Sequence, residues 1–247
     1  MPWAVSPLGG FSVKAILGRK VGMTQVFTDG GEAVPVTVIE AGPCRIMGLI
    51  DTPCQKVQLG FEAMRESRVK KPRIGFFKKI GVPPVRVIRE FESTDNKQYE
   101  VGQEIKSDLF KPGDFVDVTG ISKGKGFQGG VKRWHWSGGP KTHGSMHHRR
   151  VGSIGASADP SRVYKGTHMP GQMGARRVSI QGLRVMQVDP ENNLLLVKGA
   201  VPGHRRSLLA IRLSKKKLYQ SLEEKKARHA KSRNPMKQSK GKAKGKK

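Results

Sequence analysis

One segment in the middle of the chain, residues 122–178, follows neither the 3.6-residue period of an amphipathic helix nor the alternation of a half-buried strand. Its 57 residues include 12 glycines, 11 basic residues and a single acidic residue, Asp159. A stretch of this length without an apolar repeat is much longer than an ordinary loop, so it is either functional or disordered. We expect it to have no hydrophobic interior of its own and to extend from a folded body.

The positive charge of the chain is concentrated in this segment and in the C-terminal tail. The 247 residues contain 47 Lys and Arg against 19 Asp and Glu, a net charge of +28. Residues 122–178 carry +10 and residues 214–247 carry +12, whereas residues 1–121 and residues 179–213 carry +3 each. Because a polyanion relieves self-repulsion of this size, the charge predicts a polyanionic partner.

Several classes of protein are excluded by other features. The apolar runs are far shorter than the roughly 18 residues that a membrane-spanning helix needs, and residues 1–13 lack the basic start of a signal peptide. Two cysteines, Cys44 and Cys54, are too few for a disulfide scaffold or a cysteine-based zinc site and fit a reducing compartment. We therefore expect no membrane association.

The residues on either side of segment 122–178 predict a mainly β body. Short apolar or alternating runs, bounded by Gly, Pro and Asp, occur at 15–17, 21–27, 34–38, 57–61, 85–91, 115–118, 178–188 and 194–197. Turn residues separate successive runs at 29–31 and 189–193. Many short strands of this kind favour a barrel or a sandwich.

One helix is predicted within the body, near residues 72–80. Pro72 suits a first helical position, and Gly81 is a typical residue at a helix end. Phe76 and Phe77 lie within this helix, and the simplest interpretation is that both belong to the core. In the tail, a short basic helix up to about residue 231 is predicted, with a disordered end beyond it.

Within segment 122–178, aromatic and imidazole side chains are interleaved with basic residues and glycine. Ammonium and guanidinium groups pair with phosphates, aromatic planes stack on bases, and glycine lets a sugar–phosphate chain come close. We interpret the segment as an extended basic finger that RNA orders. The predicted phosphate-binding residues are Lys123, Lys125, Lys132, Arg133, Lys141, Arg149, Arg150, Arg162, Lys165, Arg176 and Arg177. The predicted stacking residues are Trp134, Trp136, His143, His147 and His148.

Three patterns in the same segment suggest enzymes but lack the required surroundings. Residues 124–129 match G-x-G-x-x-G, yet no helix is expected after them and no acidic residue precedes Asp159. The histidines of 143–148 have no cysteine or carboxylate close in sequence to complete a metal site. Ser153 lies outside any G-x-S-x-G context. We expect no catalytic residue, no cofactor and no metal ligand.

The chain resembles the bacterial type of the large-subunit ribosomal protein family called L-three. The resemblance spans roughly residues 14–213 and is carried by motifs that occur in the family's order, at residues 17–27, 35–40, 117–120, 122–129, 132–134, 142–145, 152–155, 165–166, 171–174 and 194–203. It implies a translation-protein-type β-barrel made by 14–121 and 179–213, with a small α+β insertion at about 45–112.

The resemblance also implies a function. Members of the family are structural and not enzymes, bind large-subunit ribosomal RNA (rRNA) early in subunit assembly, and contact neighbouring ribosomal proteins. The loop at 122–178 would run through the RNA toward the peptidyl-transferase centre, and structural Mg²⁺ would be held by the RNA. The location would be the bacterial cytoplasm, with an organellar ribosome as the alternative. Two other functions stay open, an architectural DNA-binding protein and an RNA-modifying enzyme.

Overall fold

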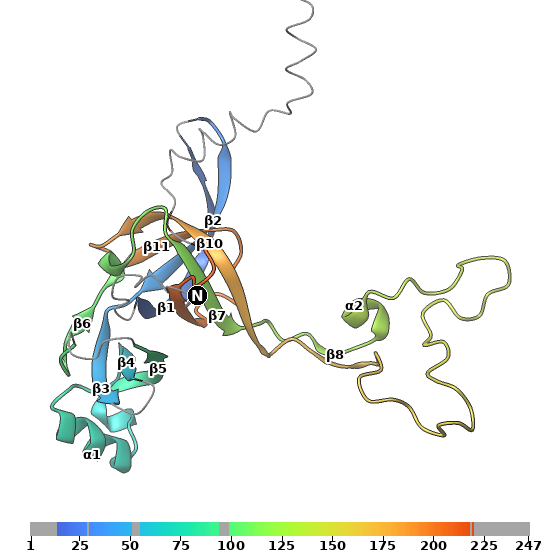
Figure 1. Cartoon of the computed structure of the whole chain (residues 1–247), viewed down its shortest axis with the longest axis horizontal. Helices are drawn as coiled ribbons and strands as arrows, with labels where there is room; N and C mark the ends of the chain where they lie inside the picture. The colour runs from blue at the N-terminus through green and yellow to red at the C-terminus, as the bar shows by residue number, and fades with distance from the viewer. Residues whose placement is uncertain (1–13, 29, 51–54, 94–98, 218, 220–247) are drawn as a thin grey trace, which may run out of the picture. The chain divides into compact units, whose positions relative to one another are not determined.

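The computed structural model describes residues 14–28, 30–50, 55–93, 99–217 and 219. These residues form two compact units: unit 1 contains the residues up to Gly120 and those from Val178 onward, and unit 2 is Ile121–Arg177. The predicted mainly β character is confirmed (Figure 1). Among the described residues, no helix is both long and apolar enough to cross a membrane. The N-terminal extension predicted at residues 1–13 lies outside the described residues, as does most of the predicted tail helix; residues 214–217 of the tail are described and are not helical.

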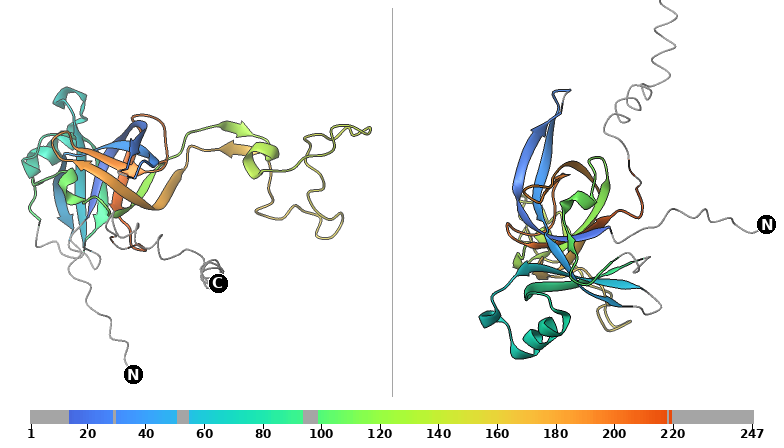
Figure 2. Two further views of the ribbon diagram at one scale, coloured as in Figure 1. Left: turned by 90° about the horizontal axis from the view of Figure 1, so that it is seen from above. Right: turned by 90° about the vertical axis from the view of Figure 1, so that its left-hand side faces the viewer.

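Six strands of unit 1 close into a barrel (Figure 2). Their order around the barrel is β1-β12-β7-β10-β11-β2. Their bounds are β1 Ala15–Phe27, β2 Ala33–Ala41, β7 Phe115–Ile121, β10 Arg177–Asp189, β11 Leu194–Lys198 and β12 Leu208–Leu213. Successive side chains of a strand point to opposite faces, and Ile16, Val118 and Ile211 are fully buried. Their burial supplies the main hydrophobic stabilisation of the barrel.

A second sheet of unit 1 has the strand order β5-β4-β3-β6. It consists of β3 Cys44–Ile50, β4 Lys56–Ala63, β5 Val85–Glu92 and β6 Glu104–Ile105, and two short 3-10 helices lie at Glu66–Arg68 and Ser107–Leu109. Ile46 and Leu59 of this sheet belong to the same buried cluster as Ile16 and Leu17 of the barrel. The sheet and the barrel therefore share one hydrophobic core.

Helix α1, Lys71–Ile80, confirms the helix predicted at 72–80. Gly81 ends it in the left-handed conformation with φ of 73°, and its N–H donates to the carbonyls of Phe77 and Lys78. The interpretation of both phenylalanines as core residues is wrong. Phe77 is 2% exposed, but Phe76 is 40% exposed, because consecutive helical residues point about 100° apart.

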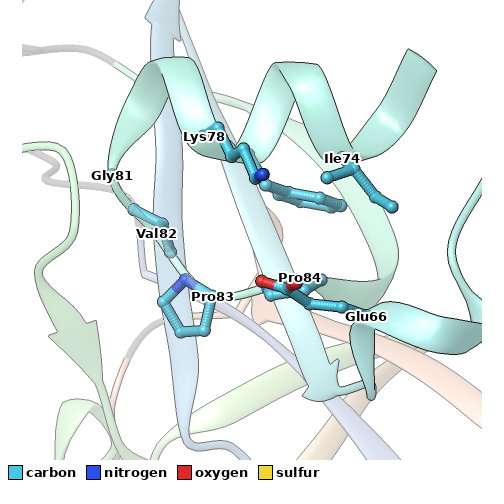
Figure 3. A pocket seen from close by; sticks show the side chains of 8 residues that line it. Glu66, Ile74, Lys78, Gly81, Val82, Pro83 and Pro84 are labelled. Carbon is cyan, nitrogen blue, oxygen red and sulfur yellow. The ribbon is translucent and has the colours of Figure 1, made fainter. Parts of the chain in front are cut away.

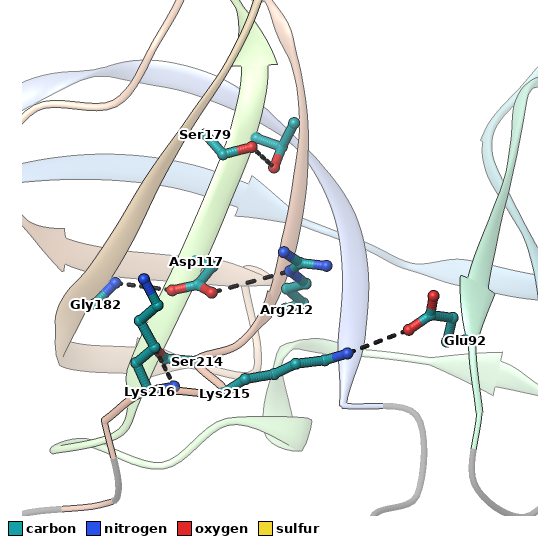
Figure 4. A network of polar contacts seen from close by, with 9 residues as sticks. Glu92, Asp117, Ser179, Gly182, Arg212, Ser214, Lys215 and Lys216 are labelled. Atoms are coloured by element: carbon teal, nitrogen blue, oxygen red, sulfur yellow. Dashed lines mark hydrogen bonds and ion pairs between the residues drawn. The ribbon is translucent and has the colours of Figure 1, made fainter.

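Asp117, buried in β7, connects three strands of the barrel (Figure 4). Its Oδ1 accepts the backbone N–H of Gly182 in β10 at 2.8 Å, and its Oδ2 lies 4.0 Å from Nε of Arg212 in β12. Thr119 lies two residues after Asp117 in β7, and its hydroxyl is 2.7 Å from the hydroxyl of Ser179 in β10. These polar contacts hold the strands through which the chain enters and leaves unit 2.

The positions of several strands differ from the prediction. The runs at 15–17 and 21–27 are one strand, β1, whose pairing with β2 shifts register between Lys20 and Gly22. Strands β3 and β12 were not predicted, because their apolar residues do not alternate clearly with polar ones. The turn predicted at 189–193 is confirmed: Oδ1 of Asp189 accepts the N–H groups of Glu191 and Asn192.

Candidate nucleic-acid interface

The two arms of unit 2 pair with each other where the unit begins and ends. Strands β8 Gly126–Gln128 and β9 Gly171–Met173 are antiparallel, with Phe127 opposite Gln172. The pairing continues toward the ends of the unit, because the N–H of Ser122 donates to the carbonyl of Arg176 at 2.9 Å. This two-stranded stem brings together Lys123, Lys125, Arg176 and Arg177, four of the predicted phosphate-binding residues.

A short helix, α2 Gly130–Trp134, follows the glycines of 124–129. The prediction that no helix follows this motif was therefore wrong. The helix has only five residues and ends at His135, which has a left-handed φ of 60°. Its Trp134 is tied to a distant part of the chain, so a tertiary contact holds a sequence that has little helical periodicity.

Trp134 and Arg133 form a local cluster with His168 and Met169. The indole of Trp134 stacks on the imidazole of His168 with ring centroids 4.0 Å apart and planes inclined by 5°. Its Nε1–H donates to the carbonyl of Met169 at 2.9 Å, and Nη1 of Arg133 donates to the same carbonyl at 2.7 Å. A Cβ at Gly171 would lie 2.6 Å from Nη1 of Arg133, so a larger residue there would displace the guanidinium from this cluster.

Trp136 packs within unit 2 as well. Its ring lies against Gly130 so closely that a Cβ at 130 would overlap it, and Gly130 is buried. Within the unit, therefore, both tryptophans predicted to stack on bases already make protein contacts. His168 and Met169 were not predicted as their partners; the only signal was that His168 belongs to the same aromatic-rich segment.

The predicted histidines lie in a looped region at residues 138–148. Nδ1 of His148 is 2.8 Å from the carbonyl oxygen of Pro140, and the N–H of Gly139 donates to the carbonyl of His148 at 3.1 Å. His143 and His147 are exposed. Among the residues that the structure describes, no three His, Cys, Asp or Glu side chains are grouped as metal ligands.

The electrostatic character of unit 2 is uniform. Of the 11 predicted phosphate-binding residues, all but the half-buried Arg133 are exposed, and the ion pairs found among the described residues include none of them. None of the buried hydrophobic side chains of the described chain comes from 121–177, as the sequence predicts. Such a surface can bind the phosphates of a nucleic acid at many points.

Comparison with known proteins places these features in a family. The family model described as ribosomal protein L3 matches residues 70–193. The large ribosomal subunit protein uL3 of Carboxydothermus hydrogenoformans is 54% identical over 202 residues, which cover 81% of this chain and 96% of that protein. The uL3 protein of Heliobacterium modesticaldum is 52% identical over 204 residues, which cover 81% of this chain and 97% of that protein. The uL3 protein of Thermotoga petrophila is 50% identical over 206 residues, which cover 82% of this chain and 98% of that protein.

The names of these relatives give no support to the two alternative functions, DNA architecture and RNA modification. The resemblance that the sequence motifs indicated is confirmed over most of the chain. On the extent of the family match and the identity to these bacterial relatives, the chain belongs to the ribosomal protein L3 family.

Proposed function

We propose that this protein is a structural, non-enzymatic constituent of the large ribosomal subunit, and that it binds large-subunit rRNA through unit 2. The observation that carries the proposal is the surface of unit 2: ten exposed basic residues, one acidic residue and no buried apolar side chain among 121–177. A chain segment of this composition gains little from packing on itself. Phosphates that neutralise it would therefore stabilise one conformation.

The two units would have different tasks. The barrel and sheet of unit 1 share a hydrophobic core, so they would fold without RNA and would provide a rigid anchor. The stem, the Trp134–His168 stack and the loop at 138–148 would give unit 2 a partly formed shape before RNA binds. In this proposal unit 2 recognises RNA shape and 2′-hydroxyls more than base edges.

The finer expectations rest on the family resemblance, which implies that the deepest part of the loop lies at about residues 143–159. The protein would bind rRNA early in subunit assembly, contact neighbouring large-subunit proteins, and extend residues 143–159 toward the peptidyl-transferase centre. Side chains there would affect the geometry of the catalytic RNA without taking part in its chemistry. The location would be the ribosome in the bacterial cytoplasm, and any structural Mg²⁺ would be held by the RNA.

Sedimentation of cell extracts at moderate and high salt tests the proposal. We expect the protein to sediment with the large subunit at both salt concentrations, because many phosphate contacts act together. A chain deleted between residues 134 and 170 should retain the melting transition of unit 1 and should impair subunit assembly or translation. A protein that stays at the top of both gradients would contradict the proposal.

A further inference from the structure

The nearly neutral charge of residues 1–121 conceals one strongly basic segment. Residues 65–79 contain seven basic residues and one acidic residue, Glu66, a net charge of +6. The other residues of 1–121 include ten basic and thirteen acidic residues, a net charge of −3. We call residues 65–79, which include α1 and the 3-10 helix before it, the α1 basic segment.

Within the described part of the chain, no ion pair joins a cation of the α1 basic segment to a carboxylate. All seven are exposed: Arg65, Arg68, Lys70, Lys71, Arg73, Lys78 and Lys79. Six ion pairs are found among the described residues, and none of them includes these seven side chains. Elsewhere in unit 1, by contrast, Arg19 and Arg86 pair with Glu62, and Arg45 pairs with Glu104. The carboxylates of unit 1 thus neutralise its sheet and barrel but leave α1 positive.

Helix α1 presents a basic face opposite to its buried side. The helix buries Phe77 and half-buries Ile74. Lys71, Gly75 and Lys79 recur at intervals of four residues and therefore share one side of the helix. Gly75 is two positions before Phe77, so this side points away from the buried one. The first turn contains no acidic residue, although the helix dipole favours negative charge there. An external anion would offset this unfavourable arrangement.

Gly75 is a second, independent indication of a ligand on this face. A Cβ built at Gly75 has no atom within 4 Å, and the φ of Gly75 lies outside the positive range that favours glycine. Neither packing nor backbone conformation in this structure therefore requires glycine. Glycine in a helix is destabilising relative to alanine, but it allows close approach of a ligand to the backbone.

The cavity beside α1 is a different feature (Figure 3). It has a volume of about 280 Å³ and is lined mainly by apolar residues, among them Ile74, Phe77 and Pro84. Glu66 contributes its carboxylate to the same cavity. Lys78 lines the cavity too, so the cavity carries one charge of each sign. Because the rest of its lining is apolar, it offers an anion no surplus of positive charge, whereas the solvent face of the helix does.

We propose that the solvent face of α1, centred on Lys71, Gly75 and Lys79, is a second RNA-binding surface that takes the sugar–phosphate backbone of large-subunit rRNA. The inference rests on the proposed function, which supplies the RNA. The lysines pair with phosphates on either side of Gly75, and the RNA backbone approaches the helix at the glycine. Phe76, which is 40% exposed, lies next to Gly75 and offers an aromatic contact to a sugar or base.

Lysine acetylation of the full-length chain locates this surface directly. An amine-reactive acetylating reagent is applied to three samples: the free chain, the chain bound to deproteinised large-subunit rRNA, and the intact subunit. Mass spectrometry measures how fast each lysine is acetylated. We expect rRNA to slow acetylation of Lys71 and Lys79 severalfold. Lys106 and Lys111, exposed in unit 1 outside the α1 basic segment, should remain reactive. Protection in the subunit without protection by rRNA would indicate a protein partner and overturn the proposal.

Two sets of variants of the full-length chain test the contacts. The double variant Lys71→Ala/Lys79→Ala should bind rRNA about 30-fold more weakly at 0.1 M salt. Each phosphate contact raises log affinity by roughly 0.7–0.9 for each tenfold decrease in salt, and this contribution is counted relative to about 1 M salt. Two lost contacts therefore remove about 1.5 log units. Gly75→Gln should weaken binding while the thermal midpoint rises or is unchanged, since glutamine favours helix more than glycine does. Gly75→Ala should show the same rise with a smaller loss of affinity.

The double variant Lys106→Ala/Lys111→Ala is the matched control, with the same loss of charge elsewhere in unit 1. Suppose that Lys71→Ala/Lys79→Ala binds rRNA as this control does, while Arg149→Ala/Arg150→Ala in unit 2 weakens binding. The proposal that α1 binds rRNA is then wrong, and the proposed function stands. If the unaltered chain binds large-subunit rRNA no better than duplex DNA, the proposed function itself fails.

Discussion

The indole of Trp134 and the imidazole of His168 lie face to face, with centroids 4.0 Å apart and planes within 5° of parallel. The neighbouring contact of Trp134 with the Met169 carbonyl closes a loop of 35 residues. In a unit that contributes no buried hydrophobic side chain, this cluster and the β8–β9 stem provide much of the order. Unit 2 is thus organised by a few pairwise contacts.

Removing the stack should loosen unit 2 locally. We expect Trp134→Ala and His168→Ala to lower the free energy of local opening by about 1–3 kcal/mol, because the aromatic pair and the partly buried hydrogen bond of Trp134 each contribute about 1 kcal/mol. Hydrogen exchange of peptides that cover 130–136 and 166–173 measures this. Phe127→Ala, at a side chain 76% exposed, is the control. Unchanged exchange in both variants would contradict the role of the stack.

Loss of basic residues from unit 2 should change the salt dependence of rRNA binding. Arg149→Ala/Arg150→Ala should reduce the slope of log affinity against log salt by about 1.4–1.8, because two phosphate contacts are lost. Filter binding of large-subunit rRNA between roughly 0.1 and 0.5 M salt, concentrations chosen to cover the screened range, measures the slope. A slope equal to that of Lys106→Ala/Lys111→Ala would show that these arginines do not contact phosphate.

Two glycines of β1 should respond differently to the same substitution. A Cβ at Gly18 would lie 2.5 Å from the carbonyl oxygen of Glu40 on β2, whereas a Cβ at Gly22 has no atom within 4 Å. We expect Gly18→Ala to lower the free energy of unfolding by about 1–3 kcal/mol through overpacking. Gly22→Ala should change it by less than about 0.5 kcal/mol. Urea denaturation compares the two; equal midpoints would contradict the close packing at Gly18.

The buried thiol of Cys44 should be inert in the folded protein. Burial raises the pKa of Cys44 to about 12, against a partial lowering by a hydrogen bond with the Leu17 backbone. Thiolate is the reactive form, so alkylation at about pH 8 should modify Cys44 only after unfolding, as peptide mass spectrometry can measure. In the unfolded chain the pKa of this thiol lies near its ordinary value of 9.0. The contribution of Cys44 to stability is therefore complete below that pH.

That contribution should decrease as the pH rises from 9.0 toward about 12, by about 1.4 kcal/mol per pH unit, because only the unfolded chain loses the proton in this range. Cys44→Ala removes the titrating group and should flatten this part of the stability profile relative to the unaltered chain. Identical profiles in this alkaline range would show that the pKa of Cys44 is not raised by folding.

Helices and strands were located well from the sequence where the spacing of apolar residues matches the side chains that the structure buries. The Pro72 and Gly81 signals bracket α1 within one residue, and the alternating valines at 34–38 lie in β2. The same reasoning failed for β3 and β12, which lack a clear alternation. It also placed Phe76 in the core, because sequence spacing does not show how narrow the buried side of α1 is.

By itself, the sequence determined that the chain has a mainly β body and that a glycine-rich, basic segment at 122–178 lacks a hydrophobic interior, since both properties depend on local composition and spacing. Only the tertiary structure decided which strands close the barrel and which residue stacks on Trp134. It also decided which cations form ion pairs: arginines of the barrel and the sheet do, whereas among the described residues those of the α1 basic segment do not. These features join residues far apart in the chain, and their pairing depends on how the whole core packs.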